Sequence, residues 1–198
     1  MEKSDPVQEV STDDACPCVM NLTDVIVQLK SEGNKCFREG NYEDSLEIYS
    51  AGAKICPLDF VEQRAVFFAN RAATNVKFDE LDRVVADCTV ALLLKPDYLK
   101  VLQRRASTLE KLDKLDESLE DTKRILAIDP GNTEAHVASG RLSQKINERN
   151  EKLKDEMIDK LKDVGNLILK PFGLSTNNFR MVQDEKTGSY SINFVNNS

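Results

Sequence analysis

Five cationic and amide side chains at helix-compatible spacings are the residues of this sequence best suited to carry chemistry. Lys30 and Asn34 are four residues apart, as are Lys100 and Arg104, so each pair would share one face of a helix. Asn70 lies 34 residues before Arg104. Lysine and arginine supply fixed positive charge and asparagine supplies neutral amide donors, a combination that suits the binding of carboxylates through charge-assisted hydrogen bonds.

A segment that recurs at a fixed offset must position these side chains. Shifting residues 71–96 forward by 34 pairs identical residues, among them Arg71 with Arg105 and Pro96 with Pro130. A third, more diverged copy lies upstream at an offset of 39. We place the copies at residues 24–57, 59–96 and 98–130. The five surplus residues before the second copy either lengthen its loop or add a turn to the helix that follows.

Each copy has the pattern of two short amphipathic helices joined by a tight turn and closed by a proline, which cannot continue a helix. A period of 34 residues that ends in proline is typical of the tetratricopeptide repeat. Small residues recur at Gly33, Ala72 and Ala106, where a larger side chain would force crossing helices apart. Adjacent repeats of a solenoid place equivalent positions side by side, so Asn70 and Arg104 should be neighbours on its concave surface.

A long helical pattern follows the third proline. Asn132 is a suitable N-cap, and apolar residues recur at helical spacing from Ala135 to Ile168. The first part of this helix should cap the solenoid, because a terminal repeat otherwise leaves its apolar face in water. Beyond about Asn147 the helix is densely charged. A thin apolar stripe remains there, made of Met157, Leu161, Val164 and Ile168.

The apolar residues after Pro171 change to a period of two, which predicts a β-hairpin. They are Phe179, Met181, Tyr190, Ile192 and Phe194. Because an isolated hairpin is marginal in water, these side chains should bury against the preceding apolar stripe or form a surface for a partner. The predicted fold class is all-α: a tetratricopeptide-repeat solenoid of three helix-turn-helix repeats plus a long C-terminal capping helix, with a small C-terminal β-hairpin.

Composition divides the chain into three parts and limits the ligands and the cellular location that we expect. Residues 1–22 are interpreted as a disordered acidic tail, residues 23–147 as the repeats and capping helix, and residues 148–198 as the charged helix extension and hairpin tail. A formal net charge of −7 argues against nucleic-acid binding, and without a run of about eighteen apolar residues no membrane span is expected. No signal-peptide pattern is present, so we expect a cytoplasmic protein. We also expect it to be a monomer.

The sequence shows no catalytic arrangement, so we expect neither an enzyme nor a cofactor. It has no phosphate-binding glycine loop and no nucleophile with a plausible base, and its five cysteines lack the spacing of a metal site. Cys36 and Cys88 fall on apolar helix faces and are expected to be core thiols. Five aspartates recur with the repeat and are interpreted as mostly turn and solvated-face residues, namely Asp79, Asp82, Asp113, Asp116 and Asp121.

The pattern of Lys30, Asn34, Asn70, Lys100 and Arg104 resembles the carboxylate clamp of tetratricopeptide co-chaperones, with all five clamp positions filled. The resemblance implies that these side chains hold the terminal aspartate of the Glu-Glu-Val-Asp tail of heat-shock protein 90 or heat-shock protein 70. Phe37 and Lys77 match positions that touch the upstream part of the peptide in relatives.

Nearly all of residues 24–198 is similar to the tetratricopeptide repeat protein 1 family, and segments 162–167, 171–176 and 188–195 carry this likeness. The resemblance implies an adaptor or co-chaperone in protein folding. The alternative is a signalling scaffold that binds its partner through the C-terminal helix and hairpin.

Overall fold

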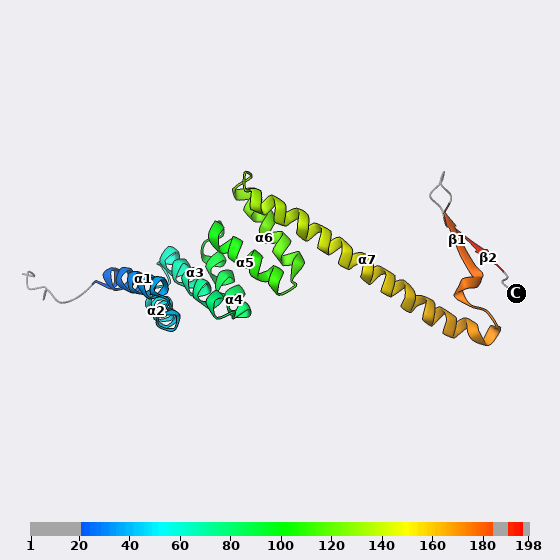
Figure 1. Cartoon of the computed structure of the whole chain (residues 1–198), viewed down its shortest axis with the longest axis horizontal. Coiled ribbons are helices and arrows are strands. Elements are labelled where there is room, and N and C mark those ends of the chain that lie inside the picture. The colour runs from blue at the N-terminus through cyan, green and yellow to red at the C-terminus, as the bar shows by residue number, and fades with distance from the viewer. Residues whose placement is uncertain (1–20, 184–189, 196–198) are drawn as a thin grey trace, which may run out of the picture. The chain divides into compact units, whose positions relative to one another are not determined.

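The computed structural model describes residues 21–183 and 190–195, which are helical apart from one small hairpin (Figure 1). Six short helices come first: α1 (Leu22–Glu39), α2 (Tyr42–Ile55), α3 (Val61–Lys77), α4 (Leu81–Leu94), α5 (Leu99–Lys111) and α6 (Leu115–Ile128). Each of them packs mainly on its neighbours in the chain. This arrangement confirms the prediction of an all-α tetratricopeptide-like helical repeat.

The rest of the chain consists of the long helix α7 (Thr133–Leu169), two 3-10 turns, η1 (Lys170–Phe172) and η2 (Thr176–Asn178), and the strands β1 (Phe179–Gln183) and β2 (Tyr190–Phe194). The chain forms two compact units, and the boundary between them lies within α7, after Ser139. None of the helices in the described ranges combines the length and the apolarity that crossing a membrane requires.

The turn inside each repeat depends on one residue with a left-handed backbone. These residues are Gly40 with φ of 84°, Asp79 with φ of 56° and Asp113 with φ of 58°. Glycine adopts this conformation freely, and aspartate is among the few other residues that tolerate it. The prediction that Asp79 and Asp113 are turn residues is therefore confirmed.

The five surplus residues before the second copy of the repeat lie mainly in a helix. Helix α3 has 17 residues and its counterpart α5 has 13, so α3 is about one turn longer. The connection before α3, residues 56–60, is one residue longer than residues 95–98 before α5. Of the two alternatives, the extra helical turn accounts for most of the surplus, and the spacing of the later repeats stays at 34 residues.

Small residues allow the helices of the first repeats to cross closely. A Cβ atom added at Gly33 would lie 2.5 Å from the ring of Tyr49 on α2, and one added at Gly52 would overlap the ring of Phe67 on α3. Both rings are almost fully buried and belong to one apolar cluster. Glycine at these two positions is therefore required by packing, as predicted for Gly33.

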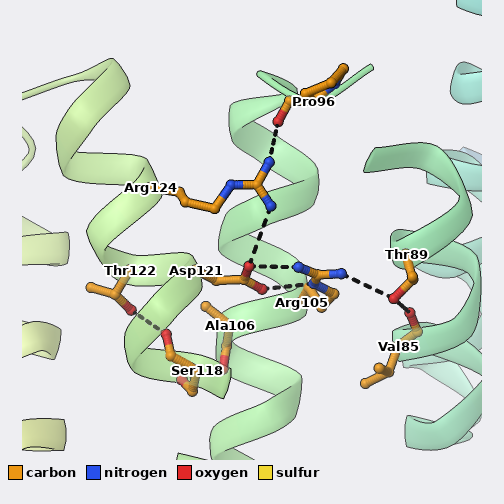
Figure 2. Close-up of polar contacts among 9 residues, drawn as sticks. All are labelled: Val85, Thr89, Pro96, Arg105, Ala106, Ser118, Asp121, Thr122 and Arg124. Carbon is orange, nitrogen blue, oxygen red and sulfur yellow. Dashed lines mark hydrogen bonds and ion pairs between the residues drawn. The ribbon is translucent and has the colours of Figure 1, made fainter. Parts of the chain in front are cut away.

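Two ion pairs with buried carboxylates recur at positions 34 residues apart, each joining the two helices of one repeat. Arg105 on α5 donates from Nε and Nη2 to the two carboxylate oxygens of Asp121 on α6, at 2.7 and 2.6 Å (Figure 2). Its Nη1 donates to the hydroxyl of Thr89 on α4 at 3.0 Å. Arg71 pairs with Asp87 in the same bidentate way. Each arginine thus joins the two helices of its own repeat, and its remaining donor, Nη1, contacts a hydroxyl of the preceding repeat.

This geometry corrects the interpretation of Asp121 as a turn or solvated-face residue. Its side chain is 2% exposed, and Arg124 approaches it at 3.9 Å in addition to Arg105. The hydrogen bonds that Arg105 donates to Asp121 raise the pKa of the Arg105 guanidinium, against the opposing effect of burial. Asp121 is therefore a structural acid that joins α5 and α6 within the third repeat.

Helix α7 begins as the sequence predicts. The side-chain oxygen of Asn132 accepts a hydrogen bond from the backbone N–H of Ala135 at 3.0 Å, which is the geometry of an N-cap. Ala135 is buried in the apolar cluster that also contains Val101 and Leu102 of α5. The first turn of α7 therefore joins the core of the repeat unit.

The C-terminal unit differs from the expectation in one respect. Strands β1 and β2 pair antiparallel, with Phe179 opposite Phe194, so the predicted hairpin is confirmed. However, Phe179, Ile192 and Phe194 are 41%, 66% and 55% exposed. The stripe on α7 is exposed as well, at Leu153, Met157, Leu161, Val164 and Ile168. The predicted mutual burial is wrong for these side chains, whereas Met181 and Tyr190 lie outside the described side chains.

Candidate carboxylate-binding groove

The structure brings four of the five predicted clamp residues to one cavity of about 310 Å³. They come from the first helices of the three repeats: Asn34 from α1, Asn70 from α3, and Lys100 and Arg104 from α5. The fifth residue, Lys30, lies one turn earlier on α1 and lines a smaller neighbouring pocket of about 180 Å³. Phe37 lines the cavity of about 310 Å³ too.

Asn34 has its amide oriented by two hydrogen bonds. Its side-chain oxygen accepts from the hydroxyl of Tyr49 at 2.7 Å and from Nδ2 of Asn70 at 3.2 Å. An amide whose oxygen is occupied by donors presents its NH₂ group in the other direction, so Asn34 can donate to an incoming acceptor. Tyr49 is 2% exposed, and burial raises the pKa of its phenol, which therefore stays a neutral donor.

Arg104 is anchored to the neighbouring repeat. Its Nη1 donates to the backbone carbonyl of Ala69 on α3 at 3.0 Å, and the side chain is half-buried. The guanidinium has further N–H groups that this bond does not use. Lys100, one turn earlier on α5, is exposed. Together they place two positive charges beside the amides of Asn34 and Asn70. This arrangement of donors can bind a pair of carboxylates.

A second cavity of about 500 Å³ continues from the first, since Phe37, Ala73 and Arg104 line both. Lys77 of α3 lies in it, with Nζ 5.9 Å from the centre of the Phe37 ring and 5.7 Å from that of Tyr42. These are cation–π distances, so the two rings hold the lysine in place. The structure thus brings together Phe37 and Lys77, the two predicted groove residues.

The two connected cavities, which we call the groove, differ in charge from the chain as a whole. The formal net charge of the chain is −7, yet Lys77, Lys100, Arg104 and Lys111 line the two connected cavities together with a single acid, Glu134. A positively charged concave surface on an acidic protein favours anionic ligands through local attraction. Sequence reasoning missed Lys111 and Glu134, although Lys111 is the 34-residue counterpart of Lys77.

The cysteines do not form a reactive centre in the described ranges. Burial raises the pKa of the Cys88 thiol from 9.0 to about 12, so it stays protonated. Cys88 and Cys56 are buried, whereas Cys36 is only half-buried and the expectation of a core thiol is too strong there. Among the described residues, no three His, Cys, Asp or Glu side chains gather as a metal ion would require.

Comparison with known proteins agrees with this geometry, although no protein-family model matches the chain. The chain is 36% identical over 86 residues to the human mitochondrial import receptor subunit TOM70, a match that covers 43% of this chain and 14% of TOM70. It is 38% identical over 76 residues to human DnaJ homolog subfamily C member 7, covering 38% of this chain and 15% of that protein. The chain therefore spans about one seventh of these relatives.

Solved structures extend the match over the repeats. The second tetratricopeptide domain of human RPAP3 in complex with the HSP70 peptide SGPTIEEVD is 31% identical, with a TM-score of 0.55, over 62% of this chain and 98% of that one. Yeast Tom70 is 31% identical, with a TM-score of 0.61, over 68% of this chain and 27% of Tom70. The fold and the groove define a tetratricopeptide-repeat, protein-binding domain. More particularly, the chain is related to the tetratricopeptide domains of TOM70, DnaJ homolog subfamily C member 7 and RPAP3.

Proposed function

We propose that this chain is an adaptor or co-chaperone whose groove binds the acidic C-terminal peptide of heat-shock protein 90 or heat-shock protein 70. The observation that carries the proposal is the arrangement around Asn34. Its oxygen is occupied by Tyr49 and Asn70, so its NH₂ group is left to donate in a cavity that also holds Lys100 and Arg104. Such a set of donors matches a ligand with two adjacent carboxylates, as at a C-terminal aspartate.

The solved relatives support the same ligand class. RPAP3 domains similar to this chain are described bound to the HSP90 peptide SRMEEVD and to the HSP70 peptide SGPTIEEVD. In our proposal Asn34, Asn70, Lys100 and Arg104 hold the terminal aspartate, with Lys30 at the edge of the site. Phe37 and Lys77 contact the residues upstream. The proposed setting is a cytoplasmic monomer of the tetratricopeptide repeat protein 1 family.

The proposal is tested by titrating SRMEEVD, with a free or an amidated C-terminus, against the wild type and a Lys100→Glu/Arg104→Glu double variant. Charge-assisted hydrogen bonds contribute about 1.5–3 kcal/mol each, so removing two should abolish a micromolar affinity of about −8 kcal/mol. Amidation removes one carboxylate and should weaken binding at least tenfold.

A matched control is the Lys114→Glu/Lys123→Glu double variant. Both lysines are exposed and line neither cavity, and their replacement changes the net charge by the same amount. This variant should bind like the wild type. Undiminished binding by the folded Lys100→Glu/Arg104→Glu variant, or equal binding of the amidated peptide, contradicts the proposal.

A further inference from the structure

The larger cavity of the groove contains one acid among its lining residues. Glu134, in the first turn of α7, lines it together with Lys77, Arg104 and Lys111. Glu134 belongs to the same compact unit as the repeats and its side chain is exposed. A ligand that filled both cavities would therefore meet positive charge along most of its length and a negative charge at one place.

The length of α5 indicates which residue of the ligand would lie beside Glu134. From Lys100 to Lys111 the helix rises about 16 Å at 1.5 Å per residue. An extended peptide covers a similar distance, about 17 Å, in five residues. With its terminal aspartate at Lys100 and Arg104 and its chain running along α5, the peptide brings its sixth residue from the C-terminus to the end of the groove at Lys111 and Glu134.

We infer that Glu134 makes the far end of the groove a subsite for a basic side chain at the sixth position from the peptide's C-terminus. This inference rests on the proposed function. The two acidic residues before the terminal Val-Asp would be attracted by Lys77 and Arg104, which line the same cavity, and the basic residue by Glu134 at its far end. The peptide SRMEEVD has arginine at this position, whereas SGPTIEEVD has threonine. The groove should therefore prefer the first peptide.

The expected change in peptide affinity follows from the exposure of Glu134. Exposed ion pairs contribute modestly, which corresponds to a change in affinity of about two- to fivefold. Replacing the arginine of SRMEEVD by alanine should weaken binding to the wild type by this factor. The same replacement should make no difference to the Glu134→Gln variant, because the uncharged amide cannot distinguish the two peptides electrostatically.

The experiment is a titration of SRMEEVD, SAMEEVD and SEMEEVD against the wild type, Glu134→Gln, Glu134→Lys and the control Glu120→Gln, at low salt. Glu120 is an exposed α6 residue that lines neither cavity, so its variant should keep the wild-type order of peptides. Glu134→Lys should reverse the order and bind SEMEEVD best. Circular dichroism checks that each variant keeps its helices.

The outcomes separate this inference from the proposal on which it depends. If the wild type binds none of the three peptides, the proposed function itself is wrong. If the wild type binds SRMEEVD and SAMEEVD equally, or if Glu134→Gln keeps the preference for arginine, the groove binds acidic tails but Glu134 does not select the upstream residue.

Discussion

Replacing Asp121 by asparagine should reveal how much the ion pair with Arg105 stabilises the packing of α5 against α6 within the third repeat. The carboxylate is 2% exposed and accepts two short hydrogen bonds from a guanidinium that is itself only 18% exposed. Removing one partner of such a pair costs about 3–5 kcal/mol, because the other charge remains buried and unpaired. Asparagine keeps one oxygen acceptor, so we expect a loss near 3 kcal/mol.

Equilibrium unfolding in urea, followed by circular dichroism, measures this loss against the wild type. The equivalent pair in the second repeat provides an internal comparison, since Asp87 and Arg71 are 8% and 26% exposed. Asp87→Asn should therefore cost less, about 2 kcal/mol. A loss below about 0.5 kcal/mol for Asp121→Asn, or a larger loss for Asp87→Asn, would refute the reasoning from burial.

Three further predictions concern single side chains. Gly40→Ala should destabilise the fold by about 1–2 kcal/mol, because its φ of 84° is left-handed, whereas Asp113→Gly, measured by the same urea unfolding, should be neutral or slightly stabilising. Tyr49→Phe should weaken acidic-peptide binding in a calorimetric titration by about two- to tenfold, since Asn34 loses the donor that orients it; unchanged affinity would contradict this role. At pH 8 a thiol with a pKa of about 12 is ionised to roughly one part in ten thousand, so mass spectrometry after iodoacetamide treatment should find Cys88 unmodified and half-buried Cys36 alkylated.

Much of the fold could be predicted because the repeat encodes it locally. Helix periodicity, the closing prolines and the N-cap at Asn132 act within a few residues of each other, and the structure places them as expected. The role of Asp121 could not be predicted, because its partner Arg105 lies on another helix and a surface aspartate looks the same in sequence. The recurrence of both residues 34 positions after Asp87 and Arg71 was the available signal.

The residues that line the groove could be predicted, but the orientation of their side chains could not. Repeat spacing places equivalent residues of neighbouring repeats side by side, which is why Asn70 and Arg104 line one cavity. Spacing carries no information about the hydroxyl of Tyr49, which reaches Asn34 across the crossing that Gly33 makes possible. The hairpin of the tail was predicted correctly, but the burial of its side chains was not, because apolar residues of a marginal hairpin were assumed to need cover, whereas exposed apolar residues are common at protein surfaces.

The apolar stripe of α7 and the basic groove should respond to salt in opposite ways. The exposed apolar residues of α7 recur at eleven-residue intervals, since Leu153 and Val164 are eleven residues apart, as are Met157 and Ile168. This period gives 3.67 residues per turn, close to that of a straight helix, so the side chains stay in line. Association through such a row strengthens in sulfate and phosphate, which favour apolar burial, whereas binding to the groove weakens as added ions screen its charges. Changing the ionic strength therefore tells which of the two surfaces carries any interaction of this chain.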